Sequence, residues 1–395
     1  MWRTLISSAV VLAVLMVVYT VIRAHKLGPV KKLAEKSRAL SWLAAFAVPA
    51  VLVLPFLAIN VYSPVIVLFH LFVFWLLCDI IGFVVKKLSV LGRESEDSLA
   101  ADSGGAEEQQ KTAKKRPYIA GYVAIALTIV VMSFGWYNAH HISRTYYKEQ
   151  TSKAVVEPVR AVLIADSHLG ITMDGEKFAK EMQRIQAEAP DMVFLVGDFV
   201  DDDSTKEDML AACKALGELK TTYGVYFVYG NHDNGYYRYR DFSSAELRTA
   251  LTENGVTILE DTAVELPCNV TVVGRLDRSF PGRNNALALT KGLDHSKYII
   301  MLDHQPNDTF NETASLADLV LSGHTHGGHI FPAGQIGLLM HANDMIYGSK
   351  VQIALSAPGE EHPTRFIVTS GLSGWAIPFK TGCKSEYVVI DIAPQ

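Results

Sequence analysis

The chain has 395 residues, a formal net charge of −5 and 49% apolar side chains, with a mean hydropathy of +0.18. This length allows two or three structural units. The acidic balance argues against a nucleic-acid binder, which normally shows a basic patch or stripe. The mean hydropathy is high for a wholly soluble protein, so part of the chain has to be strongly apolar.

Cysteine usage excludes two further classes of protein. The chain has four cysteines, Cys78, Cys213, Cys268 and Cys383. None of them forms a CxxC pair, which argues against a zinc ribbon and a thioredoxin-like redox site. A disulfide between Cys268 and Cys383 stays open, because spacing alone does not show whether two cysteines meet.

Four apolar runs fill the N-terminal third, at residues 5–22, 40–59, 65–85 and 118–136. Each is long enough, or nearly so, to cross about 30 Å of hydrocarbon as a helix. A buried core helix would explain one such run, but not four in succession with polar joints. A cleaved signal peptide is the alternative for the first run, although Thr20-Val-Ile-Arg23 offers no small-residue cleavage site. We therefore predict a four-helix transmembrane region over residues 1–140.

The charges of the joints predict the orientation of these helices. The joint at residues 23–38 is basic, and so are both ends of the joint at about 86–117, whereas the joint around Asn60 has no basic residue. Basic loops stay in the cytoplasm. We therefore expect an integral protein of the cell membrane whose C-terminal domain is extracytoplasmic, provided that all four runs span. Residues 94–110, rich in Glu, Asp, Ser, Ala and Gly, predict a disordered cytoplasmic loop.

The pattern changes after a linker at residues 141–155, and residues 156–395 predict one α/β domain. Short, fully apolar runs predict buried strands at residues 161–165, 192–196, 225–229, 270–274, 298–302, 319–321, 366–369 and 387–392. Helical patterns separate the first three runs, at residues 175–188 and 206–219. This alternation implies parallel strands covered by helices, and we expect two sheets packed face to face with flanking helices.

Polar side chains follow five of the predicted strands, at the point where each strand ends. They are Asp166 and His168, then Asp198, then Asn231 and His232, then His304, and finally His324 and His326. In open α/β sheets, sites form beyond the carboxyl ends of the strands. We therefore expect one sheet edge to gather these side chains.

The residue types at these positions predict a two-metal site. Asp166 and His168, two positions apart, can reach one cation, and the carboxylate of Asp198 can bridge two cations. The histidines add imidazole nitrogens and Asn231 adds a neutral oxygen. A ligand set of oxygen and nitrogen without thiolate suits Mn, Fe or Zn. Two such cations about 3.5–4 Å apart clamp a phosphoryl group and generate hydroxide near neutral pH.

The segment Gly323-His-Thr-His-Gly-Gly-His329 is the strongest single signal, because core histidines are usually isolated. An adventitious His-rich loop is the plain alternative, but four other strand ends indicate the same site. An Asp-x-His pair alone would not decide the question, since a surface pair is common. The segment Gly230-Asn-His-Asp233 is more telling, because glycine lets the backbone turn close to a site.

Together these blocks resemble the calcineurin-like metallophosphoesterases. The blocks are Asp166-Ser-His168, Gly197-Asp198-Phe-Val-Asp201, Gly230-Asn-His-Asp233, His304-Gln-Pro306 and Gly323-His-Thr-His326, in the order typical of that family. They cover about residues 160–330, and the chain is most similar to the membrane-spanning bacterial branch with a Gly-His-Thr-His-Gly-Gly loop. His329, where that branch has Gln, and Lys380, where it often has Arg, differ at positions expected near the substrate.

The resemblance implies a role for each residue. One metal ion would be bound by Asp166, His168, Asp198 and His326, and the other by Asp198, Asn231, His304 and His324. A bridging hydroxide would attack phosphorus in line. His232 would protonate the leaving oxygen, with Asp233 orienting its imidazole. Asp201 is either a residue that orients a ligand or a solvated acid in the run of residues 201–203.

The expected activity is hydrolysis of a phosphate mono- or diester, with a lipid headgroup as one candidate substrate and membrane lipid as a partner. The alternative is a membrane sensor or scaffold whose phosphoesterase-like domain binds without hydrolysing. That alternative predicts lost ligands, and none is missing. The Gly-rich residues 371–378 are expected at the rim, with Trp375 near the site or near lipid.

Overall fold

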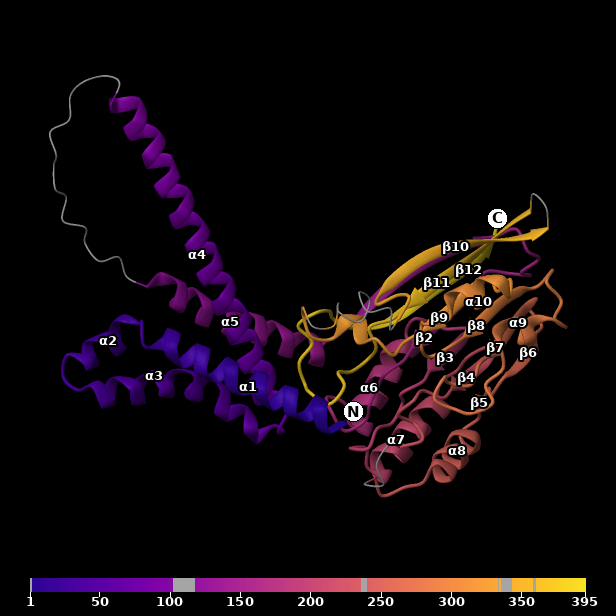
Figure 1. The fold of residues 1–395 in the computed structure, drawn as a ribbon. Coiled ribbons are helices and arrows are strands. Elements are labelled where there is room, and N and C mark those ends of the chain that lie inside the picture. Colours follow the sequence, from indigo (N-terminus) through magenta and orange to yellow (C-terminus); the bar gives the residue numbers. More distant parts are fainter. Residues whose placement is uncertain (1, 102–117, 236–239, 333, 335–342, 358–359) are drawn as a thin grey trace. The chain divides into compact units, whose positions relative to one another are not determined.

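The computed structural model describes residues 2–101, 118–235, 240–332, 334, 343–357 and 360–395 (Figure 1). The chain divides into two compact units, Met1–Ser133 and Phe134–Gln395. The first unit is helical, and the second contains all the strands that the structure describes. The predicted division into a helical region and an α/β region therefore matches the secondary structure.

The helices of the first unit begin and end close to the predicted apolar runs. They are α1 (Trp2–Ala24), α2 (Gly28–Ala34), α3 (Arg38–Val53), the 3₁₀ turn η1 (Leu54–Ala58), α4 (Ser63–Ala101) and α5 (Ile119–His140), the last of which enters the second unit. In the described part of the chain, three helical stretches are long and apolar enough to cross a membrane. A fourth span exists only if α1 and α2, which meet at 77°, count as one broken span. The structure therefore supports three or four spans.

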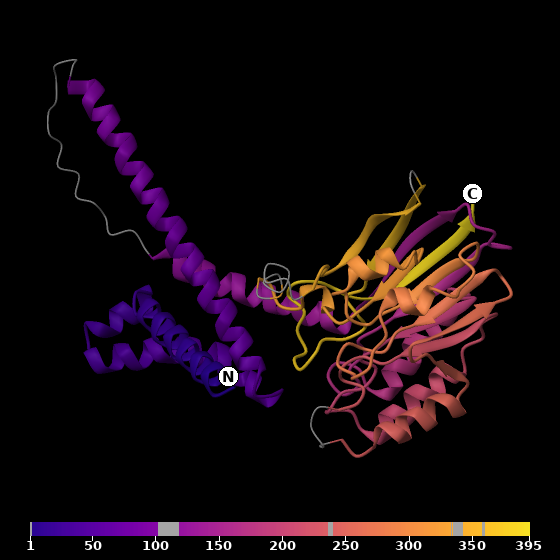
Figure 2. The ribbon, with the colours of Figure 1, turned by 45° about the vertical axis from the view of Figure 1, so that its right-hand side comes forward.

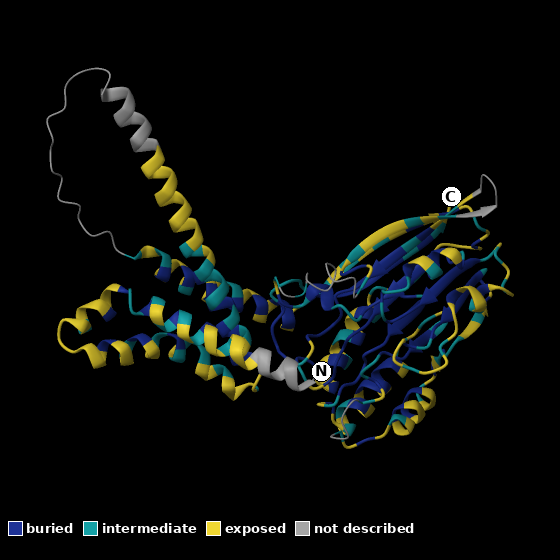
Figure 3. Cartoon of the chain, viewed as in Figure 1, coloured by how far each residue is buried: buried dark blue, intermediate teal, exposed yellow. Residues whose placement is uncertain are grey.

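The apolar faces of these spans point away from the unit itself. Only 17% to 28% of the residues in each of the three stretches are buried, and the exposed apolar positions are visible in yellow in Figure 3. Water would penalise such a surface and hydrocarbon would not. The one acid among them, Asp79, accepts hydrogen bonds from Tyr19 and Tyr118 and pairs with Arg23 at 2.6 Å. This local pair explains the carboxylate within an apolar stretch without assigning it a function.

Helix α4 corrects one boundary of the sequence analysis. The cytoplasmic loop was expected from about residue 86, but α4 continues to Ala101. Residues 89–101 contain Leu, Glu, Arg and Ala, which favour a helix even without apolar packing. The rest of the predicted loop, residues 102–117, lies outside the described residues.

The second unit contains two six-stranded sheets. In the first sheet the order is β1-β12-β2-β3-β4-β5, and in the second it is β10-β11-β9-β8-β7-β6. The strands of the first sheet are β1 (Ile142–Thr151), β12 (Ser385–Pro394), β2 (Val159–Ile164), β3 (Met192–Val196), β4 (Gly224–Val228) and β5 (Val256–Ile258). Those of the second are β10 (Gly348–Ala357), β11 (Glu360–Val368), β9 (Leu319–Ser322), β8 (Tyr298–Leu302), β7 (Val270–Gly274) and β6 (Thr262–Leu266).

The two sheets face each other, and helices cover their outer faces (Figure 2). One apolar cluster lies between the sheets and includes Leu163, Phe194, Ile300 and Leu321. A second cluster joins the first sheet to α6 (Gly175–Gln186), α7 (Lys206–Gly217) and α8 (Ser244–Glu253). A third lies on the outer face of the second sheet, beside α9 (Ala286–Thr290); α10 (Thr309–Ala314) follows β8. The predicted two-sheet α/β fold is confirmed.

The parallel strands β2, β3 and β4 pair in register, as do β7, β8 and β9. Their side chains are almost all buried, which explains their continuous apolar sequences. Parallel strands bring their carboxyl ends to the same edge of a sheet, so the loops after these strands meet at one end of the unit.

Strand β1 replaces most of the predicted linker at residues 141–155. It pairs with β12 in parallel along its whole length, from Ile142 opposite Ser385 to Thr151 opposite Pro394. It lies at the edge of the sheet, so many of its side chains are half-buried or exposed and polar. Because the strand has no continuous apolar run, its sequence does not indicate a strand.

Candidate metal centre

The predicted ligands lie at the carboxyl ends of strands from both sheets. Asp166 and His168 follow β2, Asp198 follows β3, Asn231 follows β4, His304 follows β8, and His324 and His326 follow β9. One sheet edge was expected to gather them. Instead, the edges of the two facing sheets each supply part of the site, because the inter-sheet core holds β2–β4 and β8–β9 against one another.

The ligand atoms gather in two groups, each with its atoms within 4.8 Å of one another. The groups are Asp166, His168 and His326, and Asp198, His304 and His324. Asp198 lies between them, since its Oδ2 is 3.1 Å from His304 Nε2 and 3.5 Å from His168 Nε2. A carboxylate in this position can contact two cations at once.

Asn231 is in the turn that holds Asp198. The backbone N–H of His232 donates to Asp198 Oδ1 at 2.8 Å, and Asn231 is the residue before it. The Oδ1 atom of Asn231 is buried. The turn after β4 thus carries both a buried amide oxygen and a backbone N–H that bonds the shared carboxylate.

The hydrogen bonds of the imidazole rings show which ring nitrogens are available to bind a cation at this site. His168 Nδ1 donates to Asp201 Oδ2 at 2.8 Å, and His326 Nδ1 donates to the carbonyl of Ser373 at 3.1 Å. These bonds leave a lone pair on each Nε2, and the two Nε2 atoms face each other at 3.2 Å. Two facing lone pairs repel unless a cation lies near both. The residues present therefore fit a bound metal ion.

His304 gives the same result for the second group. Its Nδ1 donates to the carbonyl of Val196 at 2.9 Å, so its Nε2 directs a lone pair toward Asp198 Oδ2. The Nε2 atom is buried and has no hydrogen bond with any described residue. Burial lowers the pKa of the neighbouring His324 to about 4, which favours the neutral imidazole that can bind a metal ion.

Most of the ligands have a left-handed backbone, which is uncommon for residues other than glycine. The φ angles are 51° at Asp166, 36° at His168, 51° at Asp198, 69° at His324 and 48° at His326. Each such residue costs about 1–3 kcal/mol, and such residues cluster at functional sites where the surroundings fix them. The strand-end turns therefore hold these side chains at the expense of local strain.

Two glycines allow the loops to approach the ligands. A Cβ atom on Gly230 would lie 2.2 Å from Asp198 Oδ1, and one on Gly323 would lie 2.4 Å from Asp166 Oδ2. Neither glycine has a positive φ. The need for glycine here is close packing against a carboxylate and not backbone freedom.

Comparison with known proteins agrees with this geometry. Residues 159–328 match the family described as calcineurin-like phosphoesterase. An uncharacterized metallophosphoesterase of Aquifex aeolicus is 31% identical over 240 residues, covering 59% of this chain and 85% of that protein. One from Helicobacter pylori is 26% identical over 335 residues, covering 82% and 83%. A Danio rerio protein named transmembrane protein with metallophosphoesterase domain is 28% identical over 358 residues, covering 84% and 71%.

This chain belongs to the calcineurin-like phosphoesterase family. It is therefore a binuclear metallophosphoesterase, a hydrolase of phosphoric ester bonds with two divalent metal ions as cofactors. The prediction of family, enzyme class and cofactor is confirmed. Mn, Fe and Zn all suit the nitrogen and oxygen donors.

Asp201 connects two histidines of this metallophosphoesterase. Its Oδ2 accepts from His168 Nδ1 at 2.8 Å and its Oδ1 accepts from His232 Nδ1 at 2.9 Å. Burial raises the pKa of Asp201, but the hydrogen bonds from the two histidines lower it further than burial raises it, so it stays ionised. Of the two interpretations left open by the sequence, the structure favours the residue that orients a ligand.

Asp233 does not take the role that the sequence analysis gave it, which was to orient His232. It accepts backbone hydrogen bonds from Asp198, Phe199, Val200 and Gly230, at 2.6–3.1 Å. Burial and the charge of Asp198 raise its pKa to about 7, while the backbone donors oppose that shift. Asp233 thus ties the turn after β3 to the turn after β4, and Asp201 takes the position beside His232.

His232 is the predicted catalytic residue that lies nearest to solvent, with 13% of its side chain exposed. Burial lowers its pKa, but the hydrogen bond with Asp201 and the nearby carboxylates raise it overall. The indole ring of Trp375 lies 5.5 Å from its imidazole. The expectation that residues 371–378 border the site is met for Trp375.

Of the two departures from the family pattern, Lys380 is buried and His329 is half-buried, with its ring 5.3 Å from that of His326. The ammonium of Lys380 donates to the carbonyl of Ser370 at 2.5 Å, and the carbonyls of Gly371 and Ser373 lie 3.5 and 3.4 Å away. Burial lowers the pKa of His329 to about 3 and that of Lys380 below its usual value. The Lys380 side chain therefore holds the loop that carries Ser373.

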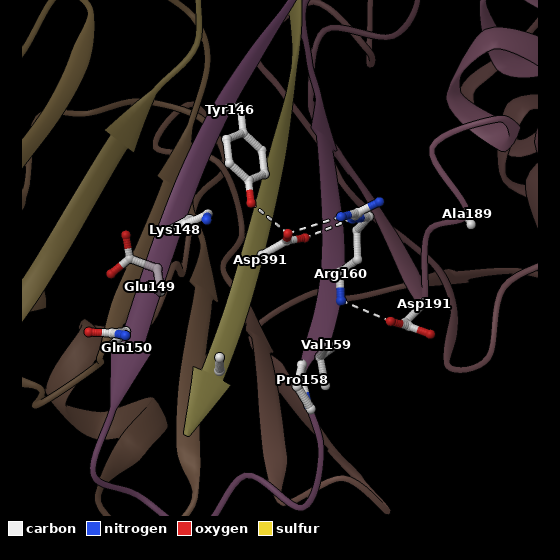
Figure 4. Close-up of a pocket in the computed structure, with 11 residues that line it drawn as sticks. Tyr146, Lys148, Glu149, Gln150, Pro158, Val159, Arg160, Ala189, Asp191 and Asp391 are labelled. Atoms are coloured by element: carbon white, nitrogen blue, oxygen red, sulfur yellow. Dashed lines mark hydrogen bonds and ion pairs between the residues drawn. The ribbon is translucent and has the colours of Figure 1, made fainter. Parts of the chain in front are cut away.

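Two other features carry no catalytic group. The four cysteines are free thiols, so Cys268 and Cys383 are not joined. A hollow of about 480 Å³ lies where β2 begins, at the opposite end of that strand from Asp166 (Figure 4). Charged side chains that line this hollow pair with one another. Arg160 forms an ion pair with Asp391 at 2.7 Å, and the Tyr146 hydroxyl donates to the same carboxylate.

Proposed function

We propose that this protein is a membrane-anchored phosphoesterase that hydrolyses a phosphate mono- or diester at the surface of the membrane. The position of Asp198 carries the proposal, because one carboxylate oxygen lies within 3.5 Å of a histidine from each sheet. The metal ligands are Asp166, His168, Asp198 and His326 for one ion, and Asp198, Asn231, His304 and His324 for the other.

When bound, two divalent ions supply Lewis acidity to the phosphoryl group and to a water molecule. The protein holds the side chains that would bind these ions in fixed orientations. The Nδ1 atoms of His168, His304 and His326 each bond a carboxylate or a carbonyl, which directs each Nε2 toward the site. Asp233 holds the turns on which Asp198 and Asn231 lie.

His232 is the proposed general acid. Its pKa is raised above the usual value, so the imidazolium is available near neutral pH to protonate the leaving oxygen. Asp201 holds the Nδ1–H of this ring and leaves Nε2 as the atom that gives up the proton. The same carboxylate fixes His168, so proton donor and metal ligand are positioned together.

The anchor and its orientation rest on the spans and on the charges between them. Three or four apolar helices support membrane insertion, and residues 1–140 and 142–395 are the proposed anchor and catalytic parts. If the four runs at residues 5–22, 40–59, 65–85 and 118–136 each span, with α2 in the first joint, the basic joints at residues 23–38 and 86–117 lie in the cytoplasm and the catalytic part lies outside. With three spans the two ends of the anchor lie on opposite sides, and the side of the catalytic part depends on which joints are inside.

A silent sensor or scaffold is not favoured, because no predicted ligand is missing and the rings are oriented for metal. The direct test uses the full chain in lipid nanodiscs. We expect close to two Mn, Fe or Zn ions per chain by elemental analysis and hydrolysis of aryl phosphate esters. Less than one ion per chain after reconstitution, together with no hydrolysis, would contradict the proposal. His232→Ala should keep its metal and lose most of its turnover.

A further inference from the structure

The last turns of α5 belong to the same compact unit as the metal centre. They contact residues 379–381 in several ways. The backbone N–H of Lys380 donates to the carbonyl of Gly135 at 2.9 Å, and the Asn138 amide donates to the carbonyl of Lys380 at 3.1 Å. The rings of Trp136 and Phe379 are 5.4 Å apart. The end of an apolar span is thus bonded to this loop.

The same loop borders the metal centre a few residues earlier. The backbone N–H of Ser373 donates to the carbonyl of Asp166 at 3.0 Å, and the carbonyl of Ser373 accepts from His326 Nδ1. The buried ammonium of Lys380 holds the carbonyl of Ser370 in the same loop. Residues 370–381 therefore connect the metal ligands directly to the end of α5.

Two large aromatic side chains on this side of the unit remain exposed. Trp375 is 46% exposed and borders His232, and Phe331 is 51% exposed. The backbone of Phe331 donates to Thr381 Oγ1 at 3.1 Å, and a Cβ atom on Gly135 would meet Thr381 Cγ2 at 2.6 Å. Phe331 and Trp375, called here the aromatic rim, lie on loops that contact both α5 and the site.

The end of α5 also carries exposed aromatic residues. Trp136 is 42% exposed and Tyr137 is 55% exposed. Tryptophan and tyrosine gather at the level of lipid headgroups, where an amphipathic ring meets both hydrocarbon and water. A loop bonded to this turn of α5 lies at the same level. Exposed Phe and Trp side chains there are costly in water and favourable in the interface.

We propose that the aromatic rim contacts the bilayer and that the substrate is a phosphate ester carried by a membrane lipid, which reaches the metal centre from the headgroup layer. This assignment rests on the proposed phosphoesterase activity and names its substrate class. Phe331 contacts the acyl region of the lipid, and Trp375 separates that region from His232. A soluble phosphate ester uses the same metal centre but gains nothing from the rim.

The first experiment compares two chromogenic diesters that share one scissile bond, with full-length protein in phosphatidylcholine nanodiscs. The probes are p-nitrophenyl hexadecyl phosphate, which inserts in the bilayer, and p-nitrophenyl methyl phosphate, which stays in water. We expect Phe331→Ser to lower the rate on the hexadecyl ester at least about fivefold, as loss of one buried aromatic contact implies, and to leave the methyl ester within about twofold. Phe331→Trp should restore the rate.

Phe310 on α10 provides the matched control, since it is 81% exposed and of the same residue type. Phe310→Ser should change neither rate. Two results would refute the proposed contact between the aromatic rim and lipid. They are equal losses on both esters after Phe331→Ser, and no loss on the hexadecyl ester. The proposed phosphoesterase activity would still stand in both cases as long as the wild-type protein cleaves the methyl ester in the same assay.

The second experiment detects contact between the aromatic rim and lipid without measuring turnover. Phe331 or Phe310 is replaced by photoreactive p-benzoylphenylalanine, and the protein is irradiated in nanodiscs that contain radiolabelled phosphatidylcholine. We expect strong labelling of the protein by lipid from position 331 and background labelling from position 310. Equal labelling from the two positions would refute the proposed contact between the aromatic rim and lipid. If the wild-type protein cleaves neither diester nor the monoester p-nitrophenyl phosphate, the proposed activity fails, and this labelling alone decides whether the rim meets lipid.

Discussion

Asp201 and His232 share a hydrogen bond of 2.9 Å between Oδ1 and Nδ1, and the other oxygen of the same carboxylate holds His168 Nδ1 at 2.8 Å. One side chain therefore positions both the proposed proton donor and a proposed metal ligand. The two functions are linked, because any movement of the carboxylate changes both rings. Asp201 acts through these histidines and is a positioning residue.

Replacement of Asp201 by Asn should alter the pH dependence of the rate. The pKa of His232 is raised because the Asp201 hydrogen bond and nearby carboxylates outweigh burial. If the imidazolium is the active form, the rate falls as the pH rises through that pKa. Asp201→Asn removes a negative charge and lowers the pKa, so the fall should begin at lower pH. At pH 8 we expect kcat for a phenyl phosphate ester to drop about 10–100-fold.

The measurement is the profile of kcat against pH, together with metal content at each pH. Asp203→Asn is the matched control, because Asp203 is exposed in the same acidic run. Its profile should overlay that of the wild-type protein. An unshifted profile in Asp201→Asn with normal metal content would remove Asp201 from the proton-transfer step.

The parts of the fold that could be predicted from sequence are those buried on both faces. Strands β2, β3, β4, β7, β8 and β9 are continuous apolar runs because helices and the opposite sheet cover them. The edge strands β1, β5, β6 and β10 were missed, because part of each meets solvent and carries polar residues. Helix α8 was also missed, although Ser243 and Glu246 form the capping box that could have indicated its start.

The sequence could indicate which side chains gather at the site, because each of them follows a recognisable strand. The residues that hydrogen-bond to these side chains could not be predicted from the sequence. Asp201 and Asp233 are each the last residue of a block that begins with glycine, and only the tertiary structure shows which of them meets His232. The left-handed φ angles at Asp166 and Asp198 likewise depend on surrounding contacts, since sequence normally assigns that conformation to glycine.

Gly230→Ala should disrupt the metal centre. The added Cβ atom would lie 2.2 Å from Asp198 Oδ1 and 2.4 Å from the Asp198 backbone nitrogen, so the shared carboxylate would have to move. We expect loss of at least one metal ion per chain by elemental analysis and at least about a hundredfold lower kcat, since a displacement near 1 Å is that costly. Gly292→Ala is the control, because nothing lies within 4 Å of its added Cβ atom. Full metal content in Gly230→Ala would contradict this account.

Arg275→Met should destabilise the second unit. The buried guanidinium pairs with Asp303 at 2.8 Å, Asp308 at 2.8 Å and Glu312 at 3.0 Å, and burial raises the pKa of Glu312. Loss of the cation leaves buried acids with less compensation, at a cost of about 3–5 kcal/mol. Thermal unfolding of the purified chain should show a clear fall in Tm. Arg278→Met removes an exposed arginine from the same loop and should change the Tm little; an equal fall in both variants would refute the role of the buried cluster.

Removal of metal ions should lower both activity and stability. Without a cation, His168 and His326 direct lone pairs at each other across 3.2 Å, and His304 directs one toward Asp198. Metal binding to the folded state alone stabilises by about 4 kcal/mol when the ion is at a thousand times its Kd. Chelation should therefore lower the Tm of the wild-type protein, and Mn, Fe or Zn should restore it. Asp198→Ala removes the shared ligand, so its Tm should respond to added metal much less than the wild-type Tm does. An equal metal-dependent shift in both proteins would show that the ions bind elsewhere.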